Sequence, residues 1–284
     1  MPIIDTHIHL FDRPFARAFN ADHIKRGPEG EVTQYENFRR THNISHAFVI
    51  CYEYRPNPRN NEYVLNLSKR RKWILPFGFV KSNPSTMAKQ AAKLLKKKFF
   101  GLTFYPDSSD AVWLTKSPRW MAERKMHDFW ALVEEQQVPV SINMNHTNVP
   151  ILLKVLDRYP NCILLLAHMV FPVVKNGNLN KPFLVTKELK NYPNVFVKLS
   201  GFYALSAKGW KYPQDDMFPA IDFLREHFTA KRLLFASDAV PVLPFNTMKQ
   251  TVEMLRTEYH GFSKKEIQDI YYNNAAAIIR RRQK

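Results

Sequence analysis

Cysteine is scarce in this 284-residue sequence, and no apolar run approaches the roughly 18 residues that a membrane span requires. The two cysteines, Cys51 and Cys162, cannot form a disulfide framework or a cysteine-based zinc site. They fall at the end of one predicted strand and the start of another, so we expect free thiols in the core. The opening residues lack the features of a secretory signal, and we expect a soluble, cytoplasmic protein without a membrane partner.

Glycine is also scarce, with eight residues in the whole chain. An open, doubly wound sheet that binds a nucleotide cofactor needs a Gly-rich turn after a strand. The loop after the first predicted strand contains His9, Asp12 and Arg13 instead. The scarcity of glycine therefore makes an enzyme with a nucleotide cofactor a less favoured prediction than other classes of enzyme.

Acidic residues are outnumbered, with 25 Asp and Glu against 42 Lys and Arg, which gives a formal charge of +17. Such a charge attracts nucleic acids, anionic membranes or acidic substrates. The densest basic runs, 69–72, 93–98 and 280–284, lie in or beside predicted helices, where Lys and Arg cover helix surfaces. We therefore expect a basic solvated exterior and a small-molecule substrate, not a nucleic-acid partner. The sequence gives no oligomeric state.

Apolar, β-rich runs alternate with helical patterns along the whole chain. The expected strands are 2–8, 46–52, 73–80, 99–105, 138–144, 162–168, 194–200 and 232–238. The helices expected after them are 34–42, 60–71, 83–97, 121–137, 148–159, 181–191, 214–228 and 246–259, with a further helix from 263 toward 281. Eight alternations predict an α/β fold, a (β/α)8 TIM barrel with an extra C-terminal helix, as one domain over residues 1–284.

The first strand ends in His7 and His9, whose spacing of two points both imidazoles the same way, with Asp5 expected on the same face. Two such histidines can meet one metal ion, although they also occur on ordinary half-exposed strands. The strand expected at 162–168 ends in His168, and the last strand ends in Asp238. Because parallel strands of a barrel end at one rim, these side chains are expected to meet there.

Other polar residues also follow the expected strands and are predicted to face a substrate pocket if the barrel forms. Arg55 can hold a carboxylate through two parallel hydrogen bonds. For each of these residues an ordinary loop position is the alternative. The predicted substrate-binding residues are Tyr54, Arg55, Tyr105, Asn143, His146 and Tyr203.

With these residues in place, the chain resembles the amidohydrolase-related branch of the amidohydrolase superfamily, TIM barrels that hydrolyse lactones and amides or decarboxylate aromatic acids. The resemblance implies that His7 and His9 bind a divalent metal, zinc or manganese, and that Asp238 is a further ligand or the base that activates water. It assigns His168 to a second metal or to polarising the substrate carbonyl. The matching segments are 5–9, 101–106, 195–201, 234–238 and 273–276, together with His168.

Two residues depart from the pattern of that family. Asn143 stands where many metal-binding members have a histidine at the end of the fifth strand, and His146 is a possible substitute. Thr103 stands where members often present Lys, Arg or Glu on the fourth strand, which argues against a metal pair bridged by a carbamylated lysine. The first departure matches lactonases of the family that work without metal, with Asp238 as the base and the histidines as electrophiles.

The leading hypothesis is a metal-dependent hydrolase of a small lactone, carboxylic ester or amide, in which Asp238 activates water. The alternatives are a lactonase that uses the same residues with no metal cofactor and a non-oxidative decarboxylase or hydratase. A TatD-like nuclease would suit the positive charge, but Thr103 and Asn143 speak against it. A barrel that binds a ligand without catalysis is a further alternative.

Overall fold

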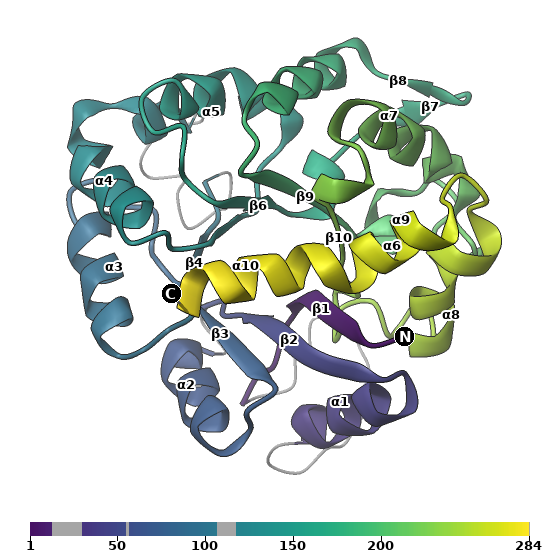
Figure 1. Cartoon of the computed structure of the whole chain (residues 1–284), viewed down its shortest axis with the longest axis horizontal. Helices are drawn as coiled ribbons and strands as arrows, with labels where there is room; N and C mark the ends of the chain where they lie inside the picture. The colour runs from purple at the N-terminus through teal and green to yellow at the C-terminus, as the bar shows by residue number, and fades with distance from the viewer. Residues whose placement is uncertain (13–29, 55–56, 107–117, 284) are drawn as a thin grey trace.

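The computed structural model describes residues 1–12, 30–54, 57–106 and 118–283, and within them the eight predicted strands form one parallel sheet (Figure 1). The strands are β1 (Ile3–Ile8), β2 (Ile44–Ile50), β3 (Ile74–Phe79), β4 (Gly101–Phe104), β5 (Val140–Ile142), β6 (Leu164–Leu166), β9 (Val195–Leu199) and β10 (Leu233–Phe235). Each predicted strand overlaps one observed strand. Seven of the observed strands lie inside the predicted range, and β2 begins two residues before it.

The sheet closes on itself. Each strand pairs with the next one along the chain from β1 to β6, and then β6 with β9 and β9 with β10. A parallel bridge between Ile8 and Ala239 joins the two ends of this order, and the Asp238 N–H donates to the His7 carbonyl at 2.9 Å. The predicted TIM barrel is confirmed; one domain over residues 1–284 stays a prediction.

Helices surround the barrel, as the pattern predicted (Figure 1). They are α1 (Gly30–Thr41), α2 (Asn60–Arg70), α3 (Met87–Lys96), α4 (His127–Glu135), α5 (Val149–Leu156), α6 (Phe202–Leu205), α7 (Phe218–Phe228), α8 (Met248–Glu253), α9 (Lys264–Gln268) and α10 (Asn274–Gln283). Shorter 3₁₀ segments are Pro118–Ala122, Arg124–Met126, His146–Asn148, His168–Val170, Asp215–Met217 and Ala230–Arg232, and π-helical turns are Met254–Glu258 and Asp269–Asn273.

The short helix α6 was not predicted, and two segments between β6 and β9 also differ from the prediction. The sixth expected helix, Lys181–Asn191, is a run of 3₁₀ turns. A proline in its first turn and the β-branched Val185 and Thr186 make it a weak α-helix former. Before it lies an unpredicted hairpin of β7 (Val174–Lys175) and β8 (Asn178–Leu179), whose Asn-Gly turn has positive φ at both residues, a strong hairpin signal.

Two apolar layers hold the barrel together. The outer layer lies between the strands and the surrounding helices and includes Cys51 and Cys162, which are buried free thiols as expected. The inner layer fills the barrel with large side chains such as Phe48, Phe77 and Leu234. Helix α10 packs against this inner layer and crosses in front of the strands in Figure 1. It therefore closes the end of the barrel opposite the rim where His9 and Asp238 lie.

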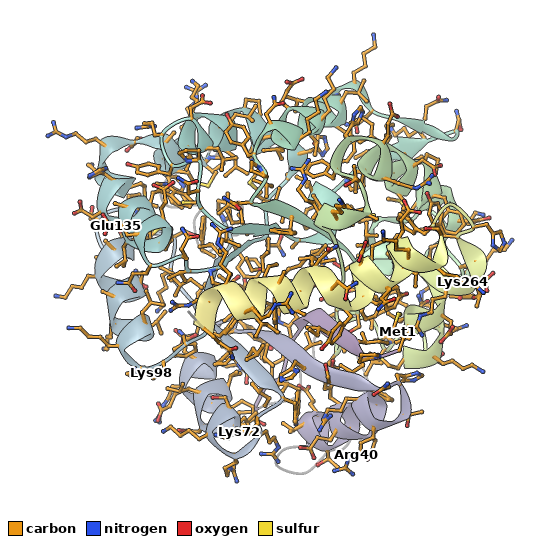
Figure 2. The ribbon with its side chains drawn as sticks, viewed as in Figure 1. Met1, Arg40, Lys72, Lys98, Glu135 and Lys264 are labelled. Carbon is orange, nitrogen blue, oxygen red and sulfur yellow. The ribbon has the colours of Figure 1, made fainter. Side chains whose placement is uncertain are left out.

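Basic side chains project from the outside of the molecule. In Figure 2 the labelled Arg40, Lys72, Lys98 and Lys264 lie at its outer margin, and all four are exposed. This distribution agrees with the expectation of a solvated basic exterior. No helix among the described residues has the length and apolar character to cross a membrane.

Candidate functional site

The rim at the carboxyl ends of β1, β6 and β10 brings together the four residues that the sequence singled out. His7 Nε2 lies 3.1 Å from His9 Nε2, and each of these atoms lies 3.7 Å from Asp238 Oδ1. His168 Nδ1 lies 3.9 Å from the other carboxylate oxygen, Asp238 Oδ2. All four residues are buried, each at most 8% exposed. The predicted juxtaposition of three histidines and one aspartate is present.

The backbone around two of these residues is strained. His168, Met169, Val170 and Phe171 all have φ between 49° and 62°, a left-handed turn without glycine. Left-handed backbone costs roughly 1–2 kcal/mol per residue of this kind. Asp238 has φ 58°. Such strain persists where the surrounding structure enforces it, and it concentrates at functional sites.

Asp5 does not join the cluster, which corrects the expectation that it shares a face with His7. The pairing register between β1 and β2 shifts between Asp5 and Ile8, so the alternation of two does not hold there. The Asp5 carboxylate accepts hydrogen bonds from Tyr35 of α1 at 2.8 Å and from the Ser237 N–H at 2.9 Å. Asp5 therefore ties β1 to α1 and to the segment that carries Asp238.

Each histidine also contacts a residue outside the cluster. His9 Nδ1 lies 2.8 Å from the Ile50 carbonyl oxygen, and His168 Nδ1 lies 3.0 Å from Ser200 Oγ. His7 Nδ1 lies 3.3 Å from the amine of Lys198, which in turn donates to Ser141 at 2.8 Å. Contacts of this kind fix the orientation of an imidazole and select which ring nitrogen carries the proton.

Burial controls the charges of the site. It lowers the pKa of His9 to about 4 and that of His168 to about 3, and it holds the pKa of His7 well below its ordinary value. Burial also raises the pKa of Asp238 to about 7, against a hydrogen bond from Tyr203 that lowers it. At neutral pH the three imidazoles are therefore uncharged, and Asp238 exchanges its proton near neutrality.

The donor atoms fit a divalent metal. The triangle formed by His7 Nε2, His9 Nε2 and Asp238 Oδ1, with edges of 3.1, 3.7 and 3.7 Å, has the spacing of ligands about 2 Å from one ion, as around zinc. Ligand atoms of His7, His168 and Asp238 also lie within 4.8 Å of one another. Imidazoles with one carboxylate form a donor set that zinc accepts.

The predicted substrate-binding residues fall into different positions. Tyr203 donates to Asp238 Oδ2 at 2.8 Å and belongs to the cluster. The ring of Tyr105 packs against Tyr52 at 4.7 Å, and the charge of Asp238 contributes to raising the pKa of Tyr105 after burial. Tyr54 stacks on Tyr52 with ring centroids 5.4 Å apart. These tyrosines line the same side of the rim as β2 and β4.

Asn143 and His146 follow β5. The backbone N–H of Asn143 donates to the Phe104 carbonyl, and its side chain is partly exposed. His146 lies 2.7 Å from the Phe171 carbonyl through Nδ1 and 3.1 Å from Asn180 through Nε2. Contact of His146 with a substrate would require one of these hydrogen bonds to break. Arg55 lies outside the described residues.

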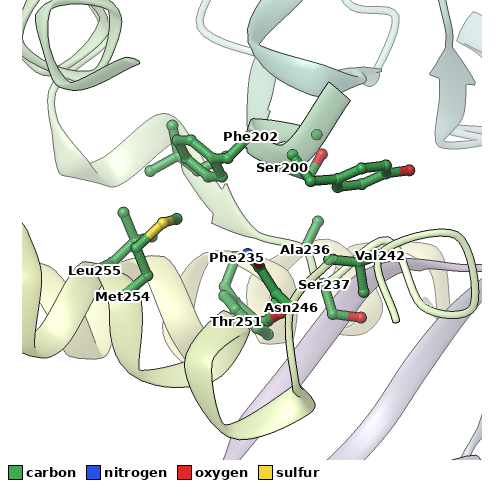
Figure 3. Close-up of a pocket in the computed structure, with 13 residues that line it drawn as sticks. Ser200, Phe202, Phe235, Ala236, Ser237, Val242, Asn246, Thr251, Met254 and Leu255 are labelled. Atoms are coloured by element: carbon green, nitrogen blue, oxygen red, sulfur yellow. The ribbon is translucent and has the colours of Figure 1, made fainter. Parts of the chain in front are cut away.

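A small cavity lies behind the cluster, between the ends of β9 and β10 and helix α8 (Figure 3). Ser200, which supports His168, lines it together with Ser237 and Asn246. Its volume of about 10 Å³ is close to the space of one water molecule. The cavity is therefore too small for a substrate and belongs to the packing behind Tyr203.

Lys198 is the site residue that the sequence reasoning missed. The pattern placed it in a strand and in a matching segment but gave it no role. Its side chain is fully buried, and burial lowers the pKa of the amine to about 7 although the charges of Asp238 and Asp5 oppose this. A lysine inside an otherwise apolar strand is the signal that could have identified it.

Comparison with known proteins finds the same fold in several solved structures. An amidohydrolase from Burkholderia multivorans, solved with bound zinc, is 16% identical and superposes with a TM-score of 0.78 over 99% of each chain. A Pseudomonas putida protein assigned as a 2-pyrone-4,6-dicarboxylic acid hydrolase is 20% identical, with a TM-score of 0.72 over 99% of this chain and 98% of that one. A 2,6-dihydroxybenzoate decarboxylase from Rhizobium is 13% identical, with a TM-score of 0.65 over 99% of each chain.

At these identities the structural matches establish the fold alone. No curated protein matches the sequence significantly. The model of the amidohydrolase family, in contrast, matches residues 4–281, from β1 into α10. The chain therefore belongs to the amidohydrolase family and is an enzyme of the amidohydrolase superfamily.

Proposed function

We propose that this protein hydrolyses a small lactone, carboxylic ester or amide, with Asp238 as the base that activates water. The observation that carries this proposal is a buried carboxylate whose pKa is raised to about 7, surrounded by three neutral histidines at the carboxyl end of the barrel. A general base works best when its pKa lies near the operating pH. Asp238 meets that condition.

The two oxygens of Asp238 have different surroundings, which suits a base. Oδ2 accepts the hydrogen bond from Tyr203, which fixes the plane of the carboxylate. Oδ1 faces His7 and His9 across 3.7 Å and is the oxygen available to take a proton from water. Imidazole N–H groups directed into the pocket can stabilise the negative charge that develops on a carbonyl oxygen under attack.

A divalent metal, when bound, would be held by His7, His9 and Asp238, with His168 as a further donor, and would supply a Lewis acid that acidifies its water. Zinc or manganese suits this donor set. Position 143 is an asparagine, where many metal-binding members of the family have a histidine. This supports the alternative in which the same residues hydrolyse a lactone without metal.

The substrate class is supported by the aromatic side chains that pack beside His9. Phe11, Tyr54, Tyr52 and Tyr105 form a continuous series of aromatic contacts that begins at His9. Aromatic side chains next to the site suit a flat, unsaturated ring. The structural neighbour assigned as a 2-pyrone-4,6-dicarboxylic acid hydrolase makes pyrone carboxylates a rational first panel, together with saturated lactones and aryl esters.

The test compares Asp238→Asn with Asp5→Asn on that panel. Without its base, Asp238→Asn should lose at least about 100-fold in kcat/KM. Its melting temperature at pH 8 should stay level or rise, because the wild type buries a charge there that asparagine does not carry. Asp5→Asn changes an equally buried carboxylate that braces β1, so it should lose stability while keeping most of its kcat/KM.

Metal dependence is decided by elemental mass spectrometry on untagged protein purified without chelator, together with hydrolysis assays before and after chelation. About one zinc or manganese per chain, with activity lost on chelation, supports the metal-dependent form. Activity that survives chelation without bound metal supports the lactonase form. Hydrolytic activity that Asp238→Asn retains would refute the role of Asp238.

A non-oxidative decarboxylase remains the second candidate, because the 2,6-dihydroxybenzoate decarboxylase from Rhizobium has the same fold. Product analysis separates the two reactions. Carbon dioxide released from hydroxybenzoates, with no ring-opened acid formed from any lactone, would replace hydrolysis as the proposed activity.

A further inference from the structure

Lys198 makes an unusual contact with His7. Its amine lies 3.3 Å from His7 Nδ1, on the side of the ring that faces away from Asp238, and 2.8 Å from Ser141 Oγ. The side chain is fully buried and also lies over the ring of Phe77 at 5.9 Å. A buried lysine is rare because desolvating the amine is costly, so its contacts invite a functional explanation.

Ile50, His9, His7 and Lys198 form a series of hydrogen bonds. The direction of each bond in this series follows from the contact at the Ile50 end. The Ile50 carbonyl can only accept, so His9 Nδ1 carries a proton and donates to it. A neutral His9 then has a lone pair on Nε2, and His7 Nε2, 3.1 Å away, must be the donor. A neutral His7 with its proton on Nε2 has a lone pair on Nδ1, which accepts from Lys198.

The opposite arrangement fails at the contact between the two histidines. If Lys198 accepted a proton from His7 Nδ1, His7 Nε2 would present a lone pair to the lone pair of His9 Nε2 at 3.1 Å. Two acceptors at that distance repel each other. Both histidines are buried, which disfavours a charged ring.

We infer that Lys198 is a positioning residue that, by donating to Nδ1 of His7, holds this histidine in the tautomer whose Nε2–H points toward His9 and Asp238. This inference deepens the proposed function, because it makes His7 a hydrogen-bond donor into the pocket. It does not depend on which substrate is hydrolysed.

The inferred tautomer affects how His7 meets a metal. A histidine that ligates a metal through Nε2 normally donates its Nδ1–H to a carbonyl or carboxylate. His9 has that arrangement with Ile50, whereas His7 faces an amine donor at the same position. Lys198 therefore favours the donor form of His7 and opposes ligation through its Nε2. Its removal should strengthen metal binding.

The first experiment measures the tautomer in the wild-type, metal-free protein, so it needs no variant that must fold. Long-range proton–nitrogen correlation spectra of protein labelled with ¹⁵N-histidine report which ring nitrogen of each histidine is protonated. His7 is assigned as the signal lost in His7→Asn. We expect protonated Nε2 on His7 and protonated Nδ1 on His9. A protonated Nδ1 on His7 would overturn the inference.

The second experiment measures zinc affinity by calorimetry in Lys198→Gln and Lys198→Met. The glutamine amide oxygen can accept from Nδ1–H of His7, whereas methionine offers neither donor nor acceptor. Contacts behind a ligand typically change metal affinity by about 10- to 100-fold. We expect zinc to bind about tenfold more tightly to Lys198→Gln than to the wild type, with Lys198→Met between them.

Tyr35→Phe is the matched control, because it removes a buried hydrogen bond on the α1 side of the same strand without touching His7. It should lower stability and leave both the His7 tautomer and zinc affinity unchanged. Equal zinc affinity in the wild type and Lys198→Gln would reduce Lys198 to a packing role. Both readouts are independent of turnover, so a failed hydrolysis assay leaves this inference intact and a failed tautomer assignment leaves hydrolysis intact.

Discussion

Burial shifts the pKa of Asp238 and the pKa values of the three histidines in opposite directions. It removes charge from His7, His9 and His168 by lowering their pKa, and it keeps a proton on Asp238 up to about pH 7. The same desolvation thus places neutral imidazoles beside a carboxylate that loses its proton near neutrality, as the proposed base must. The hydrogen bond from Tyr203, and after it the charge of Lys198, work against burial by lowering the pKa of Asp238.

Tyr203→Phe should move the pH dependence of kcat/KM upward. Asp238 must lose its proton to act as a base, so activity rises as the pH passes its pKa. The Tyr203 hydroxyl stabilises the carboxylate and lowers that pKa, and its removal raises it. A hydrogen bond to a charged group contributes about 1.5–3 kcal/mol, so a shift of about one pH unit is expected in the ascending limb of the profile.

Tyr271→Phe is the control for that measurement, because the Tyr271 hydroxyl is also buried but donates to the Val252 carbonyl, away from the site. Its pH profile should match the wild type. If Tyr203→Phe lowers kcat/KM at every pH but leaves the ascending limb of the profile in place, a group other than Asp238 controls that limb.

The residues that could be predicted from the sequence are those at strand ends. His7, His9, His168 and Asp238 each close an apolar run, and the common rim of a parallel barrel places them together without further knowledge. Asp5 was misplaced because a register shift cannot be read from alternation. Lys198 could be placed on a strand, but its partner is 191 residues away, and only the closed barrel brings the two together.

The turn between β9 and α6 sets the position of His168. Gly201 has φ +76°, and a Cβ there would lie 2.9 Å from His168 Nδ1 and 3.0 Å from its Cβ. Gly201→Ala should therefore displace the imidazole from Ser200 and Asp238. Since a misplacement of about 1 Å in an active site can cost about 100-fold, we expect kcat/KM to fall by about 10- to 100-fold.

Gly177→Ala separates this displacement from backbone strain. Gly177 has the same φ of +76° in the β7–β8 turn, but nothing lies within 4 Å of a Cβ there. Both variants should lose about 1–2 kcal/mol of unfolding free energy from the left-handed backbone, and Gly201→Ala alone should lose activity. Equal kcat/KM for the two variants would show that His168 tolerates the added methyl group.

Elements were predictable where packing dictates them. Eight apolar runs became eight strands because each is buried on both faces, by the barrel interior and by the outer helices. The left-handed turn at His168–Phe171 could not be predicted, because none of its residues favours positive φ and the tertiary structure imposes it. The β7–β8 hairpin, in contrast, has a local signal in Asn176-Gly177, because an Asn-Gly pair favours a tight hairpin turn.

At the scale of the whole molecule, stability and chemistry occupy opposite ends of the barrel. His9, His168 and Asp238 follow the carboxyl ends of their strands, whereas α10 packs near the amino ends, against Ile4 and Leu234. In TIM barrels the carboxyl end of the strands carries the catalytic residues, and the amino end contributes to stability. The inner layer of large side chains separates them.

Ile278→Ala tests this separation. Ile278 of α10 is 3% exposed and belongs to the apolar layer that fills the barrel. Truncating a buried isoleucine to alanine costs about 2–5 kcal/mol, because transfer free energy is lost and a cavity remains. We expect a loss of that size in urea unfolding with kcat/KM unchanged below the melting transition. Leu184→Ala, at a side chain 40% exposed, should change stability by less than about 0.5 kcal/mol. A loss of kcat/KM in folded Ile278→Ala would show that the two ends are coupled through the barrel interior.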